Sequence, residues 1–207
     1  MAGSAATLRV WQTDLQGSDR AEAALRIALG IYLDRPPGSL AFALGPGGKP
    51  ELMGPAGRGV HFSLSHSGGR CVIGVSTEGP VGVDVEEVRE VPELAGIVRS
   101  RFAPDEAAEI LALSGEQRLR AFYRCWTRKE AYLKATGAGI GGDSLERVEV
   151  STGSVAALHA APGTLAGEWS LLDLDLGDGF ASALAMRHPG MGNSNQLVPI
   201  QLPLSTR

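Results

Sequence analysis

The sequence has no long apolar run, no excess of basic residues and only two cysteines, and each absence excludes a class of protein. No stretch is apolar for the roughly twenty residues that a membrane-spanning helix needs, so a membrane protein is not expected. The net charge of −4 argues against a general nucleic-acid binder. The opening MAGSAATLRVWQTD lacks the basic segment and apolar core of a secretory signal. Cys71 and Cys125 stand apart and outside any CxxC pattern, which favours buried, inert thiols in a reducing compartment. We therefore expect a cytoplasmic protein.

The pattern of apolar residues predicts a helix followed by short strands, and then the same order again. With 207 residues, 43% of them hydrophobic, the chain can form one large domain or two small ones. Helical spacing predicts a helix over 18–33, and β-branched runs bounded by glycines predict strands around 40–44, 60–65, 71–76 and 80–85. The last three are too close together for crossover helices, so we expect them to pair antiparallel.

The second half repeats this order. Helices are predicted in VPELAGIVRSRF, PDEAAEILAL and EQRLRAFYRCWTRKEAYLKATG, the last ending at Gly137. Strands are predicted in SLERVEVS, SVAALHA, EWSLLDLDL and FASALAMR. The repetition predicts an α+β fold of two similar halves packed as a pseudo-dimer. The expected boundaries are 1–80 for the N-terminal half, 81–190 for the C-terminal half and 191–207 for a flexible tail rich in Pro, Gly and Asn.

Two carboxylates share one face of the strand at the divide between the halves. In GPVGVDVEEV (79–88), Asp84 and Glu86 are two residues apart, so their side chains point the same way. Like charges that close repel each other unless something positive lies between them. The pair therefore either lies in open water or faces a cation or a basic group. A cleft between two halves is a common place for a ligand.

A second informative stretch is WTRKEAYLK (126–134), on the longest predicted helix. Glu130 and Lys134 are i, i+4 neighbours, and the simple structural interpretation is an exposed ion pair. Taken with Asp84 and Glu86, however, these residues supply the parts of a phosphoryl-type transfer. Carboxylates bind a hard divalent cation, ammonium groups bind phosphate oxygens, and one carboxylate remains to take a proton.

Four blocks of the sequence resemble the 4′-phosphopantetheinyl transferases. VGVDVE (81–86) and, about forty residues later, WTRKEAYLKATGAGI (126–140) resemble the signature of the family. FSLSHSGG (62–69) resembles the Ser-His-Ser turn of its longer, monomeric Sfp-type branch, and GGKPEL (47–52) resembles the Gly-Lys-Pro segment of that branch. Each block is a weak signal alone, but their order and spacing cover nearly half the chain. The branch itself looks like an internal duplication of the small trimeric holo-acyl-carrier-protein synthase, in agreement with the two expected halves.

The resemblance implies a reaction and a metal. The phosphopantetheine arm of coenzyme A would pass to a serine of an apo acyl or peptidyl carrier protein, releasing adenosine 3′,5′-bisphosphate. Mg²⁺ would bridge the pyrophosphate of coenzyme A and the protein carboxylates. The implied metal ligands are Asp84, Glu86 and Glu106, with Asp105 as the rival for the third position.

The resemblance also implies roles for basic residues and for Glu130. Glu130 matches the general base, or the residue that orients a basic water, and Lys134 would neutralise phosphate charge. Lys129 would reach the phosphate rim or the outer shell of the metal, because adjacent helical positions diverge by about 100°. The implied coenzyme A contacts are Lys49, Ser65, His66, Lys134 and Arg20.

The expected partner is an acidic carrier protein. Although the chain is itself net acidic, arginines on the predicted helices could form a local docking surface, or could simply be solvated and balanced by nearby carboxylates. They are Arg99, Arg101, Arg118, Arg120, Arg124 and Arg128. We expect a monomer with no nucleic-acid or membrane partner. Two other functions stay open: a non-catalytic coenzyme A or nucleotide-binding protein, and another Mg²⁺-dependent phosphotransferase or phosphohydrolase that needs no carrier protein.

Overall fold

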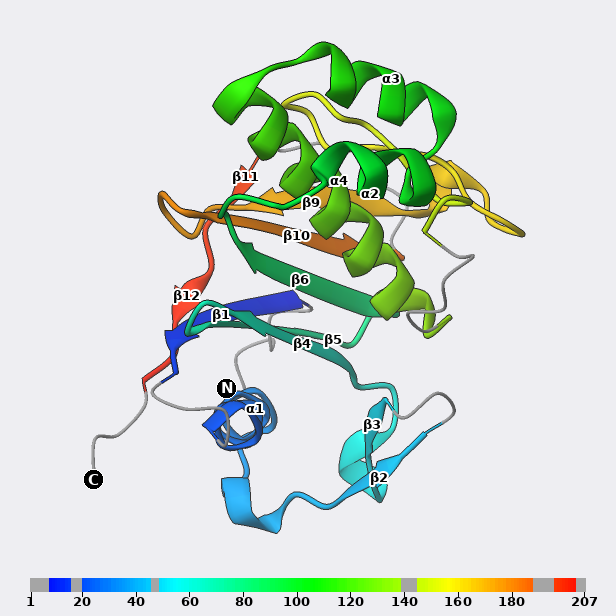
Figure 1. The fold of residues 1–207 in the computed structure, drawn as a ribbon. Coiled ribbons are helices and arrows are strands. Elements are labelled where there is room, and N and C mark those ends of the chain that lie inside the picture. The colour runs from blue at the N-terminus through cyan, green and yellow to red at the C-terminus, as the bar shows by residue number, and fades with distance from the viewer. Residues whose placement is uncertain (1–7, 16–19, 46–48, 139–144, 188–195, 204–207) are drawn as a thin grey trace.

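Two four-stranded sheets lie face to face with helices on their outer faces (Figure 1). The structure is a computed structural model that describes residues 8–15, 20–45, 49–138, 145–187 and 196–203. The strand order is β12-β1-β5-β4 in the N-terminal sheet and β11-β9-β10-β6 in the C-terminal sheet. Valines and leucines from both sheets form a shared core between them. The expected α+β fold of two halves is confirmed.

The N-terminal half runs from β1 to β5. Leu25 and Leu29, one helical turn apart on α1, pack against Phe62 and Ile73 on the outer face of the sheet. A two-residue turn joins β4 to β5, and its Gly68 and Gly69 both have positive φ, as this tight hairpin requires. The elements are β1 (Leu8–Asp14), α1 (Arg20–Leu33), β2 (Phe42–Leu44), β3 (Pro50–Leu52), β4 (His61–Ser67) and β5 (Arg70–Ser76).

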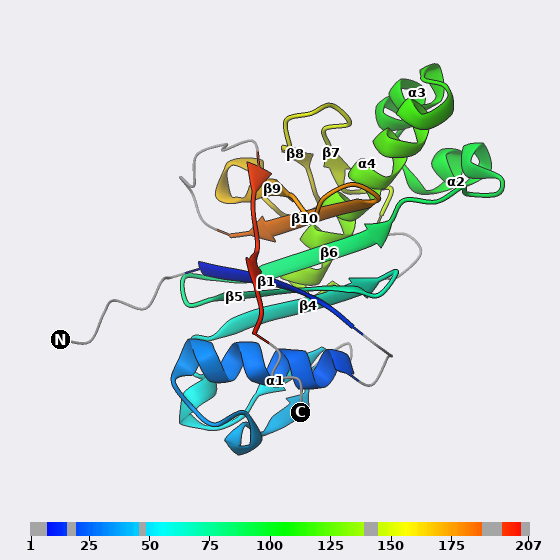
Figure 2. The ribbon, with the colours of Figure 1, turned by 90° about the vertical axis from the view of Figure 1, so that its left-hand side faces the viewer.

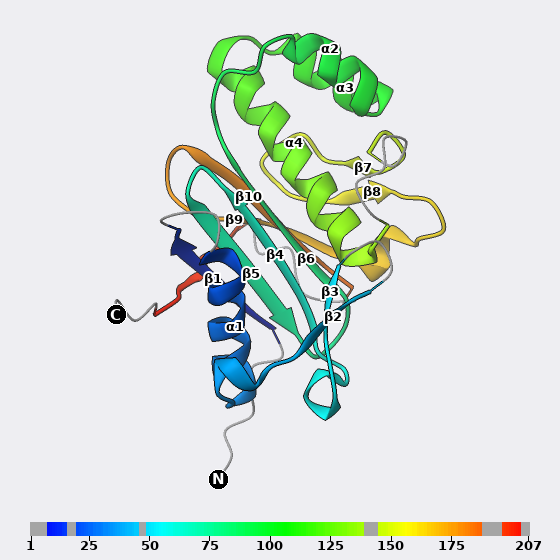
Figure 3. The same cartoon turned by 60° about the horizontal axis from the view of Figure 1, so that its bottom comes forward.

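The C-terminal half runs from β6 to β10, with α4 across the outer face of its sheet (Figure 3). Gly137, in the left-handed conformation with φ 71°, ends α4 as expected. The expected strands over 144–151 and 154–160 are reduced to the short β7 and β8. The elements are β6 (Val81–Glu87), α2 (Leu94–Arg101), α3 (Pro104–Ala112), α4 (Gly115–Thr136), β7 (Glu149–Val150), β8 (Leu158–Ala160), β9 (Ser170–Leu174) and β10 (Phe180–Met186).

The pairing of β6 differs from expectation. β4 and β5 do form an antiparallel hairpin, but β6 leaves their sheet and pairs antiparallel with β10. The chain changes layer at Gly79 and Pro80, so the odd-numbered valines of β6 face the core between the sheets while its even-numbered residues face α4. Most of β6 is thus buried on both faces, and its partner strand β10 is also mostly buried.

The C-terminal segment connects the two sheets. β11 (Gln196–Leu197) pairs parallel with β9, and β12 (Ile200–Gln201) pairs parallel with β1, so the segment passes from one sheet to the other (Figure 2). Of the expected flexible tail, 196–203 are therefore held by pairing with both sheets, whereas 191–195 and 204–207 lie outside the described residues. The reason for this pairing is the apolar content of 196–203: Leu202 is 2% exposed in the core under α1.

Two further expectations concern cysteine and the membrane. Cys71 and Cys125 are free and buried, and burial raises the pKa of both thiols. Within the described ranges, no helix has the length and apolar character that crossing a bilayer requires.

Candidate active site

The candidate site lies where α4 crosses β6, and a glycine permits the crossing. A Cβ atom on Gly82 would lie 2.0 Å from the carbonyl oxygen of Ala131 and 2.4 Å from the nitrogen of Ala135. The glycine of the VGVDVE block therefore lets the helix backbone approach the strand directly. As a result, the neighbouring Glu130 and Lys134 of α4 come close to the carboxylates of β6.

Asp84 is buried, with one oxygen bonded and the other free. Its Oδ1 pairs with Lys134 Nζ at 2.6 Å and accepts a hydrogen bond from Ser65 Oγ at 2.9 Å. Lys134 Nζ also donates to Ser65 Oγ at 2.9 Å, which closes a triangle of three side chains. Oδ2 is buried without a hydrogen-bond partner in the described part of the chain. Burial raises the pKa of Asp84, and Lys134 opposes that shift.

Alternate residues of β4 form a row of hydroxyls along β6, which we call the β4 serines (Ser63, Ser65 and Ser67). Ser63 Oγ accepts the N–H of Val83 at 3.1 Å. Ser67 Oγ accepts the N–H of Glu87 at 3.2 Å and donates to Glu86 Oε2 at 2.8 Å. The β4 serines thus join the edges of the two sheets and orient both carboxylates of the site.

Glu130 is buried on the face of α4 toward β6, and neither of its oxygens has a hydrogen-bond partner in the described residues. Burial raises the pKa of its carboxyl to about 7, and the nearby charges of Asp84 and Glu86 act in the same direction. The simple interpretation of an exposed Glu130–Lys134 ion pair is wrong, because Glu130 is only 3% exposed and Lys134 pairs with Asp84.

A second lysine, Lys49, lies beside Lys134. Lys49, from the β2–β3 hairpin, donates from Nζ to the backbone oxygen of Lys134 at 2.8 Å, bridging the two halves of the molecule. Burial lowers the pKa of Lys49, and Lys134 lowers it further. The pKa of His61 is lowered by burial and by Lys49. His61 was not predicted from the sequence, since only the placement of Lys49 beside β4 reveals it.

The residues present fit a divalent cation. Of the three carboxylates Asp84, Glu86 and Glu130, only Asp84 forms an ion pair with Lys134, and no ion pair to the other two is found among the described residues. The buried oxygens without partners, Asp84 Oδ2 and both of Glu130, are hard ligands of the kind Mg²⁺ prefers. No preformed cage of three or more ligating side chains exists among the described residues. Mg²⁺ does not need one, because it commonly takes one or two carboxylates and completes its shell with water and substrate phosphates.

Glu106 and Lys129 lie apart from this group, contrary to expectation. They form a buried ion pair with 2.5 Å between Nζ and Oε2. The Glu106 carboxylate also accepts the N–H of Ala103, capping α3, and the N–H of Val150. Lys129 Nζ donates as well to the carbonyls of Leu145 and Val148. Both groups are thus fully used in holding α3, α4 and the segment before β7 together. Asp105, the expected rival, is exposed on α3.

The other expected coenzyme A contacts fall in different places. Ser65 faces Asp84 and Lys134 rather than open solvent. His66 points to the opposite side of β4 and is exposed, and Arg20 is exposed at the start of α1. Within the described residues, no hydrogen bond or ion pair joins His66 or Arg20 to the carboxylate group.

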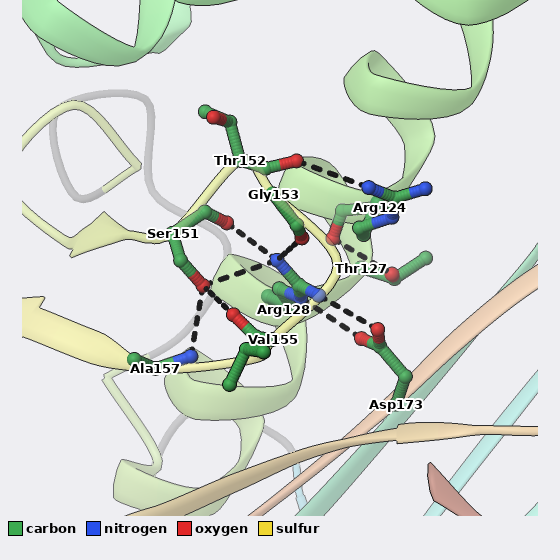
Figure 4. A network of polar contacts seen from close by, with 9 residues as sticks. All are labelled: Arg124, Thr127, Arg128, Ser151, Thr152, Gly153, Val155, Ala157 and Asp173. Carbon is green, nitrogen blue, oxygen red and sulfur yellow. Dashed lines mark hydrogen bonds and ion pairs between the residues drawn. The ribbon is translucent and has the colours of Figure 1, made fainter. Parts of the chain in front are cut away.

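Two of the expected docking arginines have structural roles. Arg128 is fully buried and binds Asp173 through two hydrogen bonds of 2.8 and 2.6 Å (Figure 4). It also donates to the carbonyls of Ser151 and Gly153. Arg118 donates to two carbonyls at the end of α3. The Arg128 guanidinium is thus out of reach of a partner protein, and two nitrogens of Arg118 already have backbone partners.

The chain is similar in sequence to known 4′-phosphopantetheinyl transferases. A family model described as the 4′-phosphopantetheinyl transferase superfamily matches residues 80–185. HetI of Nostoc sp., a 4′-phosphopantetheinyl transferase, is 38% identical over 165 residues, which cover 78% of this chain and 67% of HetI. A Synechocystis protein described as a putative 4′-phosphopantetheinyl transferase is 46% identical over 119 residues. That match covers 58% of this chain and 48% of the relative, so the chain spans about half of the Synechocystis protein. Among solved structures, the holo-[acyl-carrier-protein] synthase of Thermotoga maritima is 26% identical and covers 54% of this chain and 64% of its own, with a TM-score of 0.40.

Proposed function

Because this chain belongs to the 4′-phosphopantetheinyl transferase superfamily, we propose that it transfers the 4′-phosphopantetheine arm of coenzyme A to a serine of an apo acyl or peptidyl carrier protein. The products are the holo carrier protein and adenosine 3′,5′-bisphosphate. One observation carries the proposal: buried carboxylate oxygens without partners, on Asp84 and Glu130, lie beside the ammonium group of Lys134. That combination suits the reaction of a pyrophosphate with a serine, because the ammonium group can neutralise phosphate charge and a carboxylate can accept the proton of the serine hydroxyl.

In this reaction the serine oxygen attacks the phosphorus attached to pantetheine, and the P–O bond to the adenosine phosphate breaks. Glu130 takes the serine proton, directly or through a water, because its carboxyl has no competing partner and a pKa of about 7. Lys134 and Lys49 neutralise the oxygens of the pyrophosphate as charge builds on the leaving group. Ser65 holds the side chains of Lys134 and Asp84 in place, because its hydroxyl bonds to both.

Asp84 and Glu86 would hold Mg²⁺, which when bound supplies a positive charge to the pyrophosphate oxygens. Ser65 and Ser67 occupy one oxygen of each carboxylate and leave the other for the cation. Glu130, rather than Glu106, would be the third carboxylate beside the cation, because both oxygens of Glu106 are already bonded.

For the nucleotide end of coenzyme A we propose contacts from His66 and Arg20. Both side chains are exposed on the N-terminal half, and both can donate hydrogen bonds to a phosphate. We further propose that the protein acts as a monomer in the cytoplasm. Each sheet already has its outer face covered by a helix of the same chain, and the free buried cysteines suit a reducing compartment.

Intact-mass spectrometry of an apo carrier protein, incubated with coenzyme A, Mg²⁺ and this protein, tests the proposal. We expect a mass gain of one phosphopantetheine group, absent when the acceptor serine is alanine. Consumption of coenzyme A without carrier modification would instead identify a phosphohydrolase. Binding of coenzyme A without any turnover would identify a non-catalytic binder.

A further inference from the structure

A cleft of about 410 Å³ opens beside the candidate active site. It lies between the N-terminal half of α4 and the adjoining ends of β6, β9 and β10. Its lining includes Val88, Arg120, Arg124, Thr127, Ala181 and Ser182. Hydroxyls and guanidinium groups make up much of this wall, so the cleft suits a polar or charged ligand.

The lining of the cleft lies next to the carboxylate residues in the strand pairing and on α4. Ala181 lies opposite Glu86 in the β10–β6 register, and Ser182 Oγ donates to the backbone oxygen of Asp84 at 2.6 Å. Thr127 precedes Glu130 by one turn of α4. A chain segment that brings a serine to Glu130 can therefore extend directly into the cleft.

Arg124 brings an uncompensated positive charge to the cleft. The carboxylate on its wall, Asp173, has both oxygens bonded to Arg128 (Figure 4). Arg124 donates to the carbonyl of Thr152 at 3.2 Å, its one guanidinium hydrogen bond within the described part of the chain. Among the described residues, no carboxylate pairs with Arg124. A half-buried guanidinium without a counter-charge costs free energy, and an incoming carboxylate would recover it. Arg120 lies at the exposed edge, paired with Glu116.

We propose that this cleft receives an acidic side chain of the carrier protein, with Arg124 as its anchor and Arg120 at its rim. The proposal rests on the transferase activity proposed above. Arg124 and Arg120 precede Glu130 by six and ten residues, which is about 9 and 15 Å along a helix axis. The carrier carboxylate therefore lies roughly 9–15 Å from the serine that is modified.

Kinetics of Arg124→Glu test this docking. We expect the KM for the carrier protein to rise at least tenfold, since a close charge pair becomes a like-charge contact. The KM for coenzyme A stays within about twofold of wild type. Arg35→Glu is the matched control, because Arg35 is exposed beyond the end of α1 and the same charge change there leaves the carrier KM unaltered. A charge swap identifies the partner residue. In a set of carrier variants, each with one acidic residue near the serine changed to Lys, we expect one variant to restore most of the carrier KM that Arg124→Glu loses.

Calorimetric measurement of carrier affinity tests the docking cleft independently of the proposed transferase activity. A carrier with alanine at the acceptor position cannot be modified, so its affinity reports docking alone. Weaker binding to Arg124→Glu and to the milder Arg124→Gln, both checked for folding by circular dichroism, supports the cleft even if turnover is never seen. Equal affinity for wild type and Arg124→Glu would overturn the proposal. A raised KM for coenzyme A with unchanged carrier affinity would also overturn it, assigning the cleft to the pantetheine arm.

Discussion

At the scale of single residues, Glu130 combines two properties that seldom occur together in a protein interior. Its side chain is buried, and neither carboxyl oxygen has a hydrogen-bond partner in the described part of the chain. Buried polar groups are nearly always bonded, since an unpaired one costs about 1–3 kcal/mol. We propose that this carboxyl group receives a ligand at the meeting point of α4 and β6.

Glu130→Gln is expected to lower kcat by about 10²–10⁴ while coenzyme A binding stays nearly normal, because the amide keeps the size of the side chain but cannot accept the serine proton. The pKa of Glu130 is raised to about 7, and the deprotonated form is the active one. The wild-type rate should therefore rise as the pH increases through 7, and this limb should be absent in the variant. Rates measured between pH 6 and 8 check both points.

Glu22→Gln is the control for this change. Glu22 forms an exposed i, i+4 ion pair with Arg26, the kind of pair that the simple structural interpretation assigned to Glu130 and Lys134. The kcat of Glu22→Gln should therefore stay within about threefold of wild type. A similarly small effect of Glu130→Gln would remove it from the catalytic machinery. An intact pH limb together with a much higher Mg²⁺ requirement would make it a metal ligand instead of the proton acceptor.

At the scale of elements, two serines at the junction of β4 and β6 differ in their expected roles. Ser63 bonds only to the backbone of β6, whereas Ser67 also bonds to the carboxylate of Glu86. Ser67→Ala removes the hydrogen bond to Glu86 and leaves the N–H of Glu87 without its acceptor. We expect a loss of about 1–3 kcal/mol in unfolding free energy. We also expect a several-fold higher Mg²⁺ concentration for half-maximal rate, because Glu86 is no longer oriented.

Ser63→Ala provides the comparison, since it removes only the acceptor for the N–H of Val83. Denaturant titration should give a similar loss of stability for both variants, whereas only Ser67→Ala should shift the Mg²⁺ dependence. Identical Mg²⁺ curves for the two would limit the β4 serines to a structural role.

The crossing of α4 over β6 gives a second prediction at this scale. In Gly82→Ala the new methyl group would lie 2.0 Å from the backbone oxygen of Ala131, so the helix must move away from the strand. Overpacking of this kind costs about 1–3 kcal/mol or more, and the displacement separates Lys134 from Asp84. We therefore expect a lower melting temperature in thermal unfolding and a lower turnover rate.

Gly96→Ala is the matched substitution, because a Cβ at Gly96 on α2 meets nothing within 4 Å. A helix-interior alanine is expected to be neutral or stabilising by up to about 1 kcal/mol. Wild-type stability in Gly82→Ala would show that the helix approach is not set by this glycine.

The elements also show what could be predicted from the sequence. Local patterns predict the helices and the β4–β5 hairpin, because period and phase are local properties. The resemblance of two sequence blocks to the family signature predicts that Asp84, Glu86, Glu130 and Lys134 belong to one site. The pairing of β6 with β10, about a hundred residues later, has no local signal. The same applies to Lys129, whose backbone partners lie in the segment before β7. Nothing near Lys129 in the sequence distinguishes a structural ammonium group from a phosphate-binding one.

At the scale of the whole molecule, residues 196–203 are a strap between the two sheets. Leu197 accepts the N–H of Asp175 in the C-terminal half, and Leu202 donates its N–H to Gln12 in the N-terminal half. The candidate active site also spans the halves, since Lys49 and the β4 serines come from one and α4 from the other. Loosening the strap should therefore affect both stability and catalysis.

Truncation after residue 195 is expected to lower the unfolding free energy by roughly 3 kcal/mol, from the loss of buried Leu202 and of several backbone hydrogen bonds. For a chain of this size, that corresponds to a Tm lower by about 6–12 °C. Truncation after Pro203 keeps both strands and should leave the Tm close to wild type. Equal melting temperatures for the two truncations would show that the strap contributes nothing to stability.

The position of β12 also has a consequence for synthesis on the ribosome. The N-terminal sheet includes β1, β4 and β5, all made early, but its edge beside β1 is covered only when β12 arrives near residue 200. Until then, the nascent chain exposes an unpaired strand edge, the kind of surface that invites pairing with other chains. The first half to be translated is therefore among the last to be completed, and co-translational chaperones should bind this edge until the strap closes it.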